Sequence, residues 1–359
     1  MKIIQTLSQK HPSGELQLFK ITNRSGANVT LCNIGAGVVS IEVPDISGKL
    51  TDVVLGYKHI EDYFGDGPCM GKTPGRFANR IGNARFTLNG VEYKLNANAG
   101  GVHHLHGGAN GFANKCWQGR IDGDRVLFSL TSLDGDEGYP GTLTATVAYS
   151  WKENNELLIE LAAESDADTI INLTNHTYFN LNGENSGSIL DHILLLYATH
   201  WLPATEELIT TGEIAPVNNT PMDFTEPKRI GQDINADFAP LKNGKGYDSC
   251  WITDSASIGR QTTIAVLHSP LSGITLEVGT TLKALQVYTG NWLSGSPESK
   301  SGRSYNDYDG VALECQQWPD APNKPNFPSS VLFKGKRYEH SISFFFPSIL
   351  KNNYITHPV

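Results

Sequence analysis

The segment "INLTNHTYFNL", residues Ile171 to Leu181, carries one histidine, His176, among asparagines, threonines and aromatic residues. No nucleophile, metal partner or phosphate-binding loop stands beside it in the sequence. An imidazole has an ordinary pKa of about 6.5, so it can hold or release a proton at neutral pH. Two interpretations are open. His176 is either a packed imidazole or one half of an acid–base pair whose other half lies far along the chain.

Period-two alternation predicts strands around three such polar groups, at residues 171–179, 284–292 and 311–320. In each strand one row of side chains is apolar and is expected to meet the core. His176 shares the opposite row with Asn172 and Thr174, and Glu314 is the single ionisable group of its row. Gln286 and Tyr288 point the same way in the middle segment.

Three strands with one apolar face and one face of amides and aromatic rings suggest a sheet whose polar face is a working surface. Planar amides, carboxylates and rings suit a sugar, which offers many hydroxyls and an apolar C–H face. An ordinary solvated sheet face shows the same alternation. The pattern alone therefore leaves both interpretations open.

The elements that must position these groups are predicted to be strands throughout. Short β-rich runs alternate with turns, as in "RFTLNGVEYKL" with Asn89-Gly90 at its turn, and in residues 141–151 followed by 155–165. Only residues 226–238 are expected to form a turn or two of helix. This pattern is typical of a large antiparallel sandwich or barrel.

Charge and composition narrow the class of partner. The chain has 359 residues, a formal net charge of −9 and a sequence pI of about 5.6. This balance disfavours nucleic acid and anionic membrane surfaces, and it is compatible with a small neutral substrate. No composition break or linker divides the chain, which predicts one domain over residues 1–359.

The N-terminus and the cysteines favour a cytoplasmic protein. The first 20 residues lack the apolar core of a signal peptide, and no apolar run approaches the length of a membrane span. The 5 cysteines are scattered without a CxxC motif. We expect free thiols in a reducing compartment.

Five separate motifs, in order along nearly the whole chain, resemble the aldose 1-epimerase family, the galactose mutarotases. They are "GRFANRIGNARF" (75–86), "HHLHGG" (103–108), "NLTNHTYFNL" (172–181), "GYDSCW" (246–251) and "LECQQWPDAPNKPNFP" (313–328). The resemblance implies a single large antiparallel β-sandwich with its active site in an open cleft on one sheet.

The chemistry that the resemblance implies is the interconversion of the α and β anomers of galactose or glucose. A base removes the proton of the C1 hydroxyl while an acid protonates the ring oxygen, and the opened ring then closes on the other face. By the family pattern Glu314 is the base and His176 is the acid, with their roles reversed on closure. No cofactor and no metal are implied.

The resemblance also suggests a binding set. Arg80 and Asp248 are expected to hydrogen-bond sugar hydroxyls, His106 to lie near the ring, and Asn79 and Gln286 to be weaker members. We further expect Trp251 and Trp318 either to shape the pocket or to pack, and the Pro-rich residues 319–328 to form an ordered loop that closes the cleft. Cys315 is expected to be a buried structural thiol.

Other interpretations stay open. His104 and His106 are expected to lie on one face of a strand, a spacing that also suits metal ligands. A glycoside hydrolase would use Asp248 and Glu314 as its two carboxylates and give His176 no necessary role. A non-catalytic carbohydrate-binding sandwich would tolerate the loss of the Glu314 charge. A sugar-phosphate epimerase would need further basic residues in the cleft, where only Arg80 is an evident candidate.

The preferred hexose and the oligomeric state are open.

Overall fold

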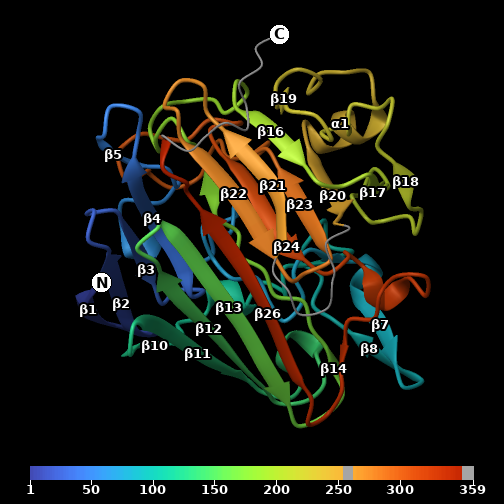
Figure 1. The fold of residues 1–359 in the computed structure, drawn as a ribbon. Helices are drawn as coiled ribbons and strands as arrows, with labels where there is room; N and C mark the ends of the chain where they lie inside the picture. Colours follow the sequence, from blue (N-terminus) through green and yellow to red (C-terminus); the bar gives the residue numbers. More distant parts are fainter. Residues whose placement is uncertain (254–261, 350–359) are drawn as a thin grey trace.

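Nearly all regular structure in the chain is β-strand (Figure 1), as the alternation predicts. The computed structural model describes residues 1–253 and 262–349. In those residues there is one α-helix, α1 (Ala239–Gly244), with five 3₁₀ turns: η1 (Ile60–Tyr63), η2 (Gly82–Ala84), η3 (Phe112–Asn114), η4 (Asp136–Gly138) and η5 (Ala321–Asn323). Within the same ranges no helix has the length and apolar character that crossing a membrane requires.

The largest sheet is antiparallel and has nine strands, ordered β10-β11-β12-β13-β26-β22-β21-β16-β19. Its strands are β10 (Gln118–Asp122), β11 (Arg125–Ser132), β12 (Leu143–Trp151), β13 (Glu156–Ser165), β26 (Arg337–Phe345), β22 (Thr275–Thr280), β21 (Thr262–His268), β16 (Ile193–Leu196) and β19 (Lys228–Arg229). The hairpin of β12 and β13 is the one predicted from residues 141–165.

Two smaller antiparallel sheets form the opposite layer. One has the order β1-β2-β3-β4-β5: β1 (Lys2–His11), β2 (Gly14–Thr22), β3 (Asn28–Cys32), β4 (Gly37–Pro44) and β5 (Leu50–Asp52). The other has the order β15-β24-β23-β20-β17-β18: β15 (Tyr178–Phe179), β24 (Val311–Gln316), β23 (Ala284–Tyr288), β20 (Asp248–Ile252), β17 (His200–Leu202) and β18 (Ala215–Pro216). They meet where Leu55 N–H donates to Tyr178 O at 3.0 Å and Asn180 N–H donates to Val53 O at 2.9 Å.

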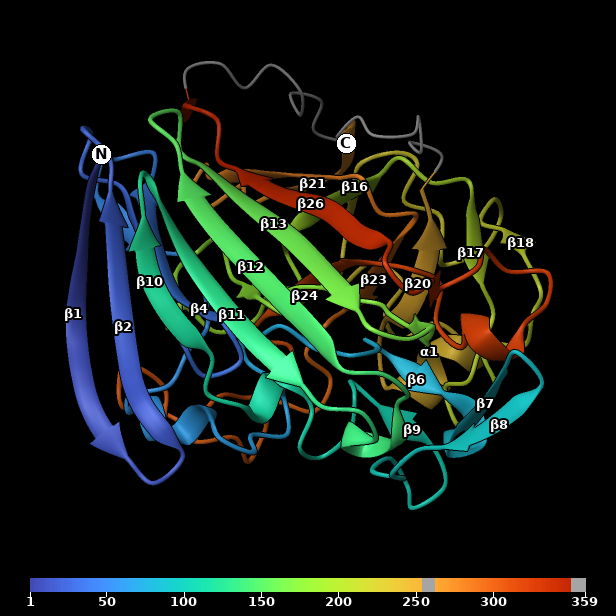
Figure 2. The same cartoon turned by 90° about the horizontal axis from the view of Figure 1, so that it is seen from below.

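The main core lies between these layers, as Figure 2 shows for β12, β13 and β26 over β23 and β24. Ile159 of the nine-stranded sheet, Leu313 and Val287 of the six-stranded sheet and Phe19 of the N-terminal sheet all belong to one buried cluster. Full burial of each such side chain contributes about 1.5–3 kcal/mol. The predicted antiparallel β-sandwich is confirmed.

Three two-stranded ribbons complete the fold: β6 (Arg80–Ile81) with β9 (His104–Leu105), β7 (Arg85–Leu88) with β8 (Val91–Lys94), and β14 (Thr169–Ile170) with β25 (Val331–Leu332). The β7–β8 hairpin is the predicted one, with φ of 52° at Asn89 and 78° at Gly90. Such positive φ values at both turn residues match the twist of the strands.

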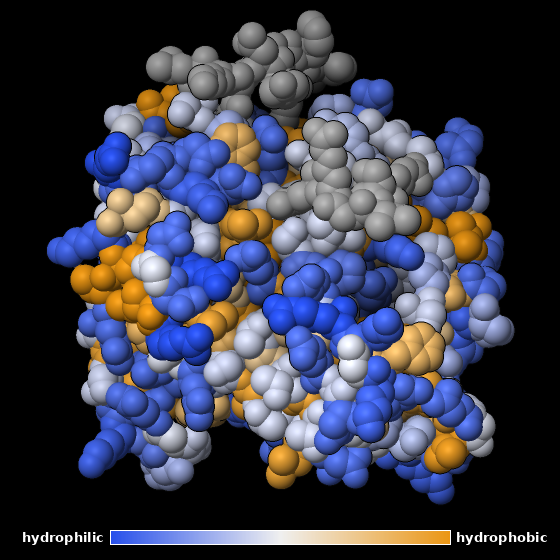
Figure 3. Space-filling view, turned by 60° about the horizontal axis from the view of Figure 1, so that its bottom comes forward, coloured by the Kyte–Doolittle hydropathy of each residue, from blue (hydrophilic) through white to orange (hydrophobic). Residues whose placement is uncertain are grey.

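The short helix expected at residues 226–238 is wrong. Lys228 and Arg229 instead pair with β16, and the helix begins only at Ala239. Pro227 and Gly231 both disfavour a helix interior, so the edge pairing prevails over local propensity. On the face of the molecule drawn in Figure 3, hydrophilic side chains predominate and apolar ones lie in separate patches.

Candidate active site

The polar groups singled out in the sequence come together around one cavity of about 690 Å³. Six of the seven predicted site residues line it: Asn79, Arg80, His106, His176, Asp248 and Glu314. The seventh, Gln286, is buried beside Asp248 and is not part of the lining. The six lie on five separate segments of the chain, so only the fold unites them.

Glu314 is held by an interior strand of the six-stranded sheet. It lies in β24 opposite Gln286 of β23, while its neighbours Leu313 and Cys315 point into the core. The alternation predicted for this strand is therefore confirmed. Cys315 is fully buried, and burial raises the pKa of its thiol to about 12, as expected of a structural cysteine.

His176 is positioned differently from the prediction. Residues 171–177 are not a strand, because they pair at only a few points with segments on either side. His176 N–H donates to Lys72 O at 2.8 Å, and Asn172 N–H donates to Arg76 O at 2.9 Å. Asn172 is fully buried and donates its side-chain amide to Ala78 O at 3.1 Å. Of the polar row that alternation assigned to a sheet face, Asn172 thus serves neighbouring backbone inside the protein, while His176 lines the cavity.

His176 and Glu314 form a buried pair. His176 Nε2 lies 3.4 Å from Glu314 Oε1, and the two residues are only 4% and 2% exposed. His176 Nδ1 and Glu314 Oε2 are both buried and have no hydrogen-bond partner within the described ranges. Buried polar atoms are normally satisfied, so two unpaired atoms on side chains that line a cavity are consistent with a functional pair.

Burial acts on both members of the pair in the direction of the neutral form. Desolvation, reinforced by the negative charge of Asp248, raises the pKa of Glu314 well above its usual value. Desolvation lowers the pKa of His176 to about 4. The pair therefore carries one proton between its two members over a wide pH range.

His106 lies against the pair. Its ring centroid is 5.3 Å from that of His176, and its Nδ1 accepts the backbone N–H of Asn79 at 3.2 Å. This bond leaves Nε2 as the protonated nitrogen of the neutral ring. Burial and the neighbouring His176 lower the pKa of His106 well below its usual value.

The expectation that His104 and His106 share one strand face is wrong. Strand β9 ends at Leu105, and His106 has a φ of 53°, which breaks the alternation. His104 instead hydrogen-bonds Asn96 O at 2.6 Å and the Tyr139 hydroxyl at 2.7 Å, away from the cavity. The two histidines therefore do not form a metal pair.

Arg80 and Asp248 form an ion pair in the lining of the cavity. Arg80 Nη1 lies 3.8 Å from Asp248 Oδ2, and both side chains are partly exposed. Gln286 donates its amide to Asp248 Oδ1 at 2.5 Å, so it orients that carboxylate. Charged groups fixed in this way can hydrogen-bond several hydroxyls of one sugar.

Sequence reasoning missed part of the lining. Tyr178, Tyr288 and Trp292 contribute aromatic surface, and the loops 61–62, 64–68 and 294–297 form further walls. The alternation pattern does place Tyr288 on the polar face with Gln286, and Tyr178 could have been found, because it stands two residues from His176. The loops carry no periodic signal.

Several predicted neighbours lie elsewhere. Trp251 is in the core and donates to Met222 O, and Trp318 packs on Phe327. The ordered segment 319–328 does not line the cavity. Asp320 in this segment accepts the N–H of Gly82 at 2.9 Å and donates its own to Arg80 O at 3.0 Å, so the segment braces the Arg80 strand.

Activity is expected to survive exhaustive treatment with EDTA, because the side chains alone can move the protons. In the described part of the chain His106, His176 and Glu314 are the group whose ligand atoms lie close enough to hold an ion, all within 4.8 Å of one another. The check is the rate of the catalysed reaction, measured before and after chelation. Loss restored by zinc or manganese would make these three residues ligands.

Comparisons with known proteins agree over almost the entire chain. The family model described as aldose 1-epimerase matches residues 17–344. Galactose mutarotase of Bos taurus is 39% identical over 334 residues, covering 93% of this chain and 95% of that protein. Aldose 1-epimerase of Haemophilus influenzae is 39% identical over 348 residues, covering 95% and 99%.

Solved structures agree in fold. An aldose epimerase homologue from C. elegans has a TM-score of 0.83 at 30% identity, covering 91% of this chain and 97% of that one. Galactose 1-epimerase from Lactobacillus acidophilus has a TM-score of 0.83 at 27% identity, covering 96% and 98%.

Proposed function

The chain belongs to the aldose 1-epimerase family, and from this premise we propose that Glu314 and His176 carry the proton transfers by which it interconverts the α and β anomers of a free aldohexose. The observation that supports this assignment is the separation of 3.4 Å between His176 Nε2 and Glu314 Oε1 at the wall of the cavity. The proposed substrates are galactose and glucose.

In the proposed mechanism Glu314, as carboxylate, takes the proton of the C1 hydroxyl. His176, as imidazolium, gives its proton to the ring oxygen, and the C1–O5 bond breaks to leave an open-chain aldehyde. Rotation about C1–C2 presents the other face of C1. The reverse transfers then close the ring, with His176 as base towards the C5 hydroxyl and Glu314 as acid towards the new C1 hydroxyl.

Burial of the pair favours this sequence. With the cyclic sugar the reactive arrangement is Glu314 carboxylate beside His176 imidazolium, and with the open-chain sugar both residues are neutral. The two arrangements hold the same single proton. Because desolvation disfavours both charges, the site stabilises the neutral arrangement that accompanies ring opening.

The remaining polar groups are assigned to substrate binding. Arg80 and Asp248 would hold sugar hydroxyls, and the Nε2–H of His106 would donate to a sugar oxygen. Asn79 supports His106 through its backbone N–H, and Gln286 supports Asp248. We therefore place Asn79 and Gln286 mainly behind the binding groups.

The pH profile of kcat/KM is expected to be bell-shaped. Below about pH 4, the value to which burial lowers the pKa of His176, the pair takes up a second proton and lacks a base. Above the raised pKa of Glu314 the pair holds no proton and lacks an acid. Rates from pH 3 to 10, corrected for spontaneous mutarotation, check this. An acid limb near pH 6.5 would contradict the neutral pair.

Polarimetry on freshly dissolved α-galactose and α-glucose, with and without the protein, tests the function itself. The expected result is accelerated approach to the equilibrium rotation. Nitrophenyl galactoside and glucoside distinguish the hydrolase alternative, since cleavage of either would make Asp248 and Glu314 the working pair. A carbohydrate-binding protein without catalysis would give neither rate.

Two broader assignments are also proposed. One domain over residues 1–359 is supported by the main core, which draws on all three large sheets, although residues 254–261 and 350–359 lie outside the described ranges. A cytoplasmic location is supported by the five cysteines, all of which are free thiols.

A further inference from the structure

The two loop walls of the cavity are joined at their bases. One wall is formed by residues 61–62 and 64–68, and the other by residues 292 and 294–297 between β23 and β24. Next to them, residues 56–58 and 298–300 run antiparallel, with Tyr57 opposite Ser299. Lys58 N–H donates to Glu298 O at 3.0 Å, and Lys300 N–H donates to Gly56 O at 3.1 Å. We call these two segments the clasp.

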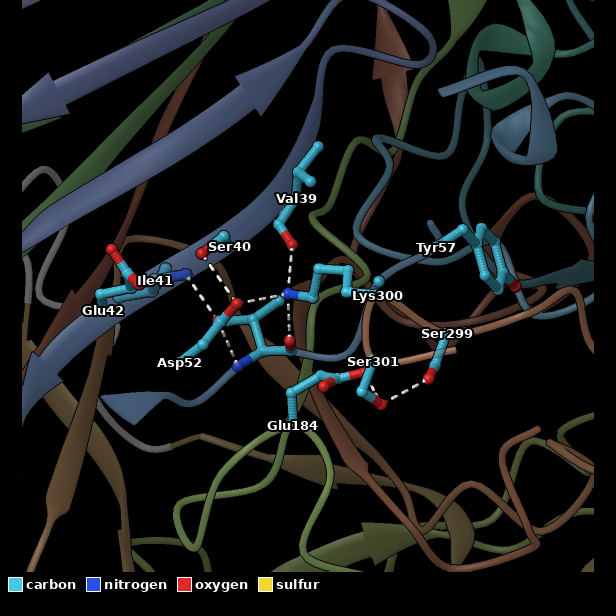
Figure 4. A network of polar contacts seen from close by, with 12 residues as sticks. Val39, Ser40, Ile41, Glu42, Asp52, Tyr57, Glu184, Ser299, Lys300 and Ser301 are labelled. Carbon is cyan, nitrogen blue, oxygen red and sulfur yellow. Dashed lines mark hydrogen bonds and ion pairs between the residues drawn. The ribbon is translucent and has the colours of Figure 1, made fainter. Parts of the chain in front are cut away.

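Lys300 secures the clasp to the N-terminal sheet (Figure 4). Its Nζ donates to Val39 O and Val54 O, both at 2.7 Å, and pairs with Asp52 Oδ2 at 2.6 Å. An ammonium group has three donors, and all three are used here. The side chains of Lys300 and Asp52 are only 19% and 24% exposed, which reduces screening by water.

The packing around Lys300 is close. A Cβ added to Gly56 would lie 3.2 Å from Lys300 Cε and 2.8 Å from Val39 O, so the lysine chain passes directly over the glycine backbone. Tyr305 adds a second anchor, because its hydroxyl accepts Gly56 N–H at 2.9 Å and lies 2.9 Å from Glu184 Oε1. The clasp is thus fixed from both sides of Gly56.

The clasp also reaches the cavity lining. The Tyr57 hydroxyl donates to Asp66 Oδ2 at 3.0 Å, and Asp66 lies in the first wall. In the second wall, Pro297 directly precedes the clasp residue Glu298. A shift of Lys300 would therefore move both walls, whereas Glu314 and His176 lie on β24 and on residues 171–177, outside the clasp.

We propose that Lys300 is a positioning residue that sets the separation of the two loop walls and thereby the affinity for the sugar. This proposal rests on the proposed function of the same cavity. Lys300 itself does not line the cavity and acts through the walls. Because Glu314 and His176 lie outside the clasp, loosening the clasp raises KM more than it changes kcat.

The test compares Lys300→Met with Lys58→Met. Lys58 lies in the same clasp and pairs with Glu298 at 3.0 Å, but at the surface, where such pairs contribute little. Lys300→Met is expected to raise KM for galactose about 10-fold with kcat within about 2-fold, since a change that weakens substrate and transition-state binding equally raises KM alone. Lys58→Met is expected to change neither constant.

A fall in kcat as large as the rise in KM would overturn the role of Lys300. A lowered melting temperature with an unchanged KM would overturn it too. If Lys300→Met does not fold, Tyr305→Phe decides, with a smaller rise in KM expected and an unchanged KM counting against the clasp. Calorimetric Kd values for galactose separate the two proposals. A wild type that binds galactose without interconverting it would overturn the proposed function. The role of Lys300 would then be tested by affinity alone, and an unchanged Kd for galactose in Lys300→Met would overturn it.

Discussion

Glu314→Gln is expected to lower the rate of anomer interconversion by about 10²–10⁴-fold, the usual contribution of a positioned general base. The amide has nearly the shape of the carboxylate but cannot accept the C1 proton. Glu314 is buried on an interior strand, and because the change is nearly isosteric, it should leave the fold intact. Polarimetry measures the rate, and circular dichroism measures the fold.

The matched control is Glu61→Gln, the same chemical change at an exposed residue of the cavity wall. This variant is expected to keep most of the activity, because Glu61 touches neither member of the buried pair. A Glu314→Gln protein that retains a wild-type rate would remove the base from the mechanism. It would also favour a site that only binds sugar.

His176→Asn is expected to lose activity by orders of magnitude while still binding sugar. The asparagine keeps a hydrogen-bond donor but has no proton to give to the ring oxygen. Arg80 and Asp248 would still hold the hydroxyls, so Kd for galactose should change much less than the rate. Polarimetry and calorimetry on the same preparation provide the two numbers.

The control for this variant is His103→Asn. His103 belongs to the neighbouring "HHLHGG" motif but does not line the cavity, and its Nδ1 accepts the N–H of Asn83 at 3.0 Å. The His103→Asn variant is expected to interconvert anomers at nearly the wild-type rate. An unimpaired rate in His176→Asn, or cleavage of a nitrophenyl glycoside by the wild type, would reject the role given to His176.

The fold class and the orientation of Glu314 could be predicted from the sequence because β24 follows the alternation rule. Leu313 and Cys315 reach the core and Glu314 reaches the cavity, as a period of two requires. The family motifs, whose resemblance the comparisons confirm, then indicated where residues distant in sequence would meet. Asp248 and Arg80 were located in this way.

What the sequence could not supply depends on tertiary contacts. Residues 171–177 look like a strand, yet the side chain of Asn172 serves buried backbone, and only the packed structure reveals this. Lys72 and Asp66 form a buried ion pair, although nothing in their spacing predicts it. Trp292 and the Lys300 clasp lie in irregular loops, where no periodicity reports the direction of a side chain.

The central claim is that Glu314 and His176 act as one unit that holds a single proton and carries out both proton transfers with the sugar. The measurement that tests it most directly is anomer exchange by NMR in Glu314→Gln, His176→Asn and the double variant, at enzyme concentrations where residual rates exceed spontaneous mutarotation. Residues that work as a unit are strongly non-additive. The account therefore predicts a double variant no slower than the slower single variant. Losses that multiply in the double variant would contradict the account, because they would show two residues contributing independently.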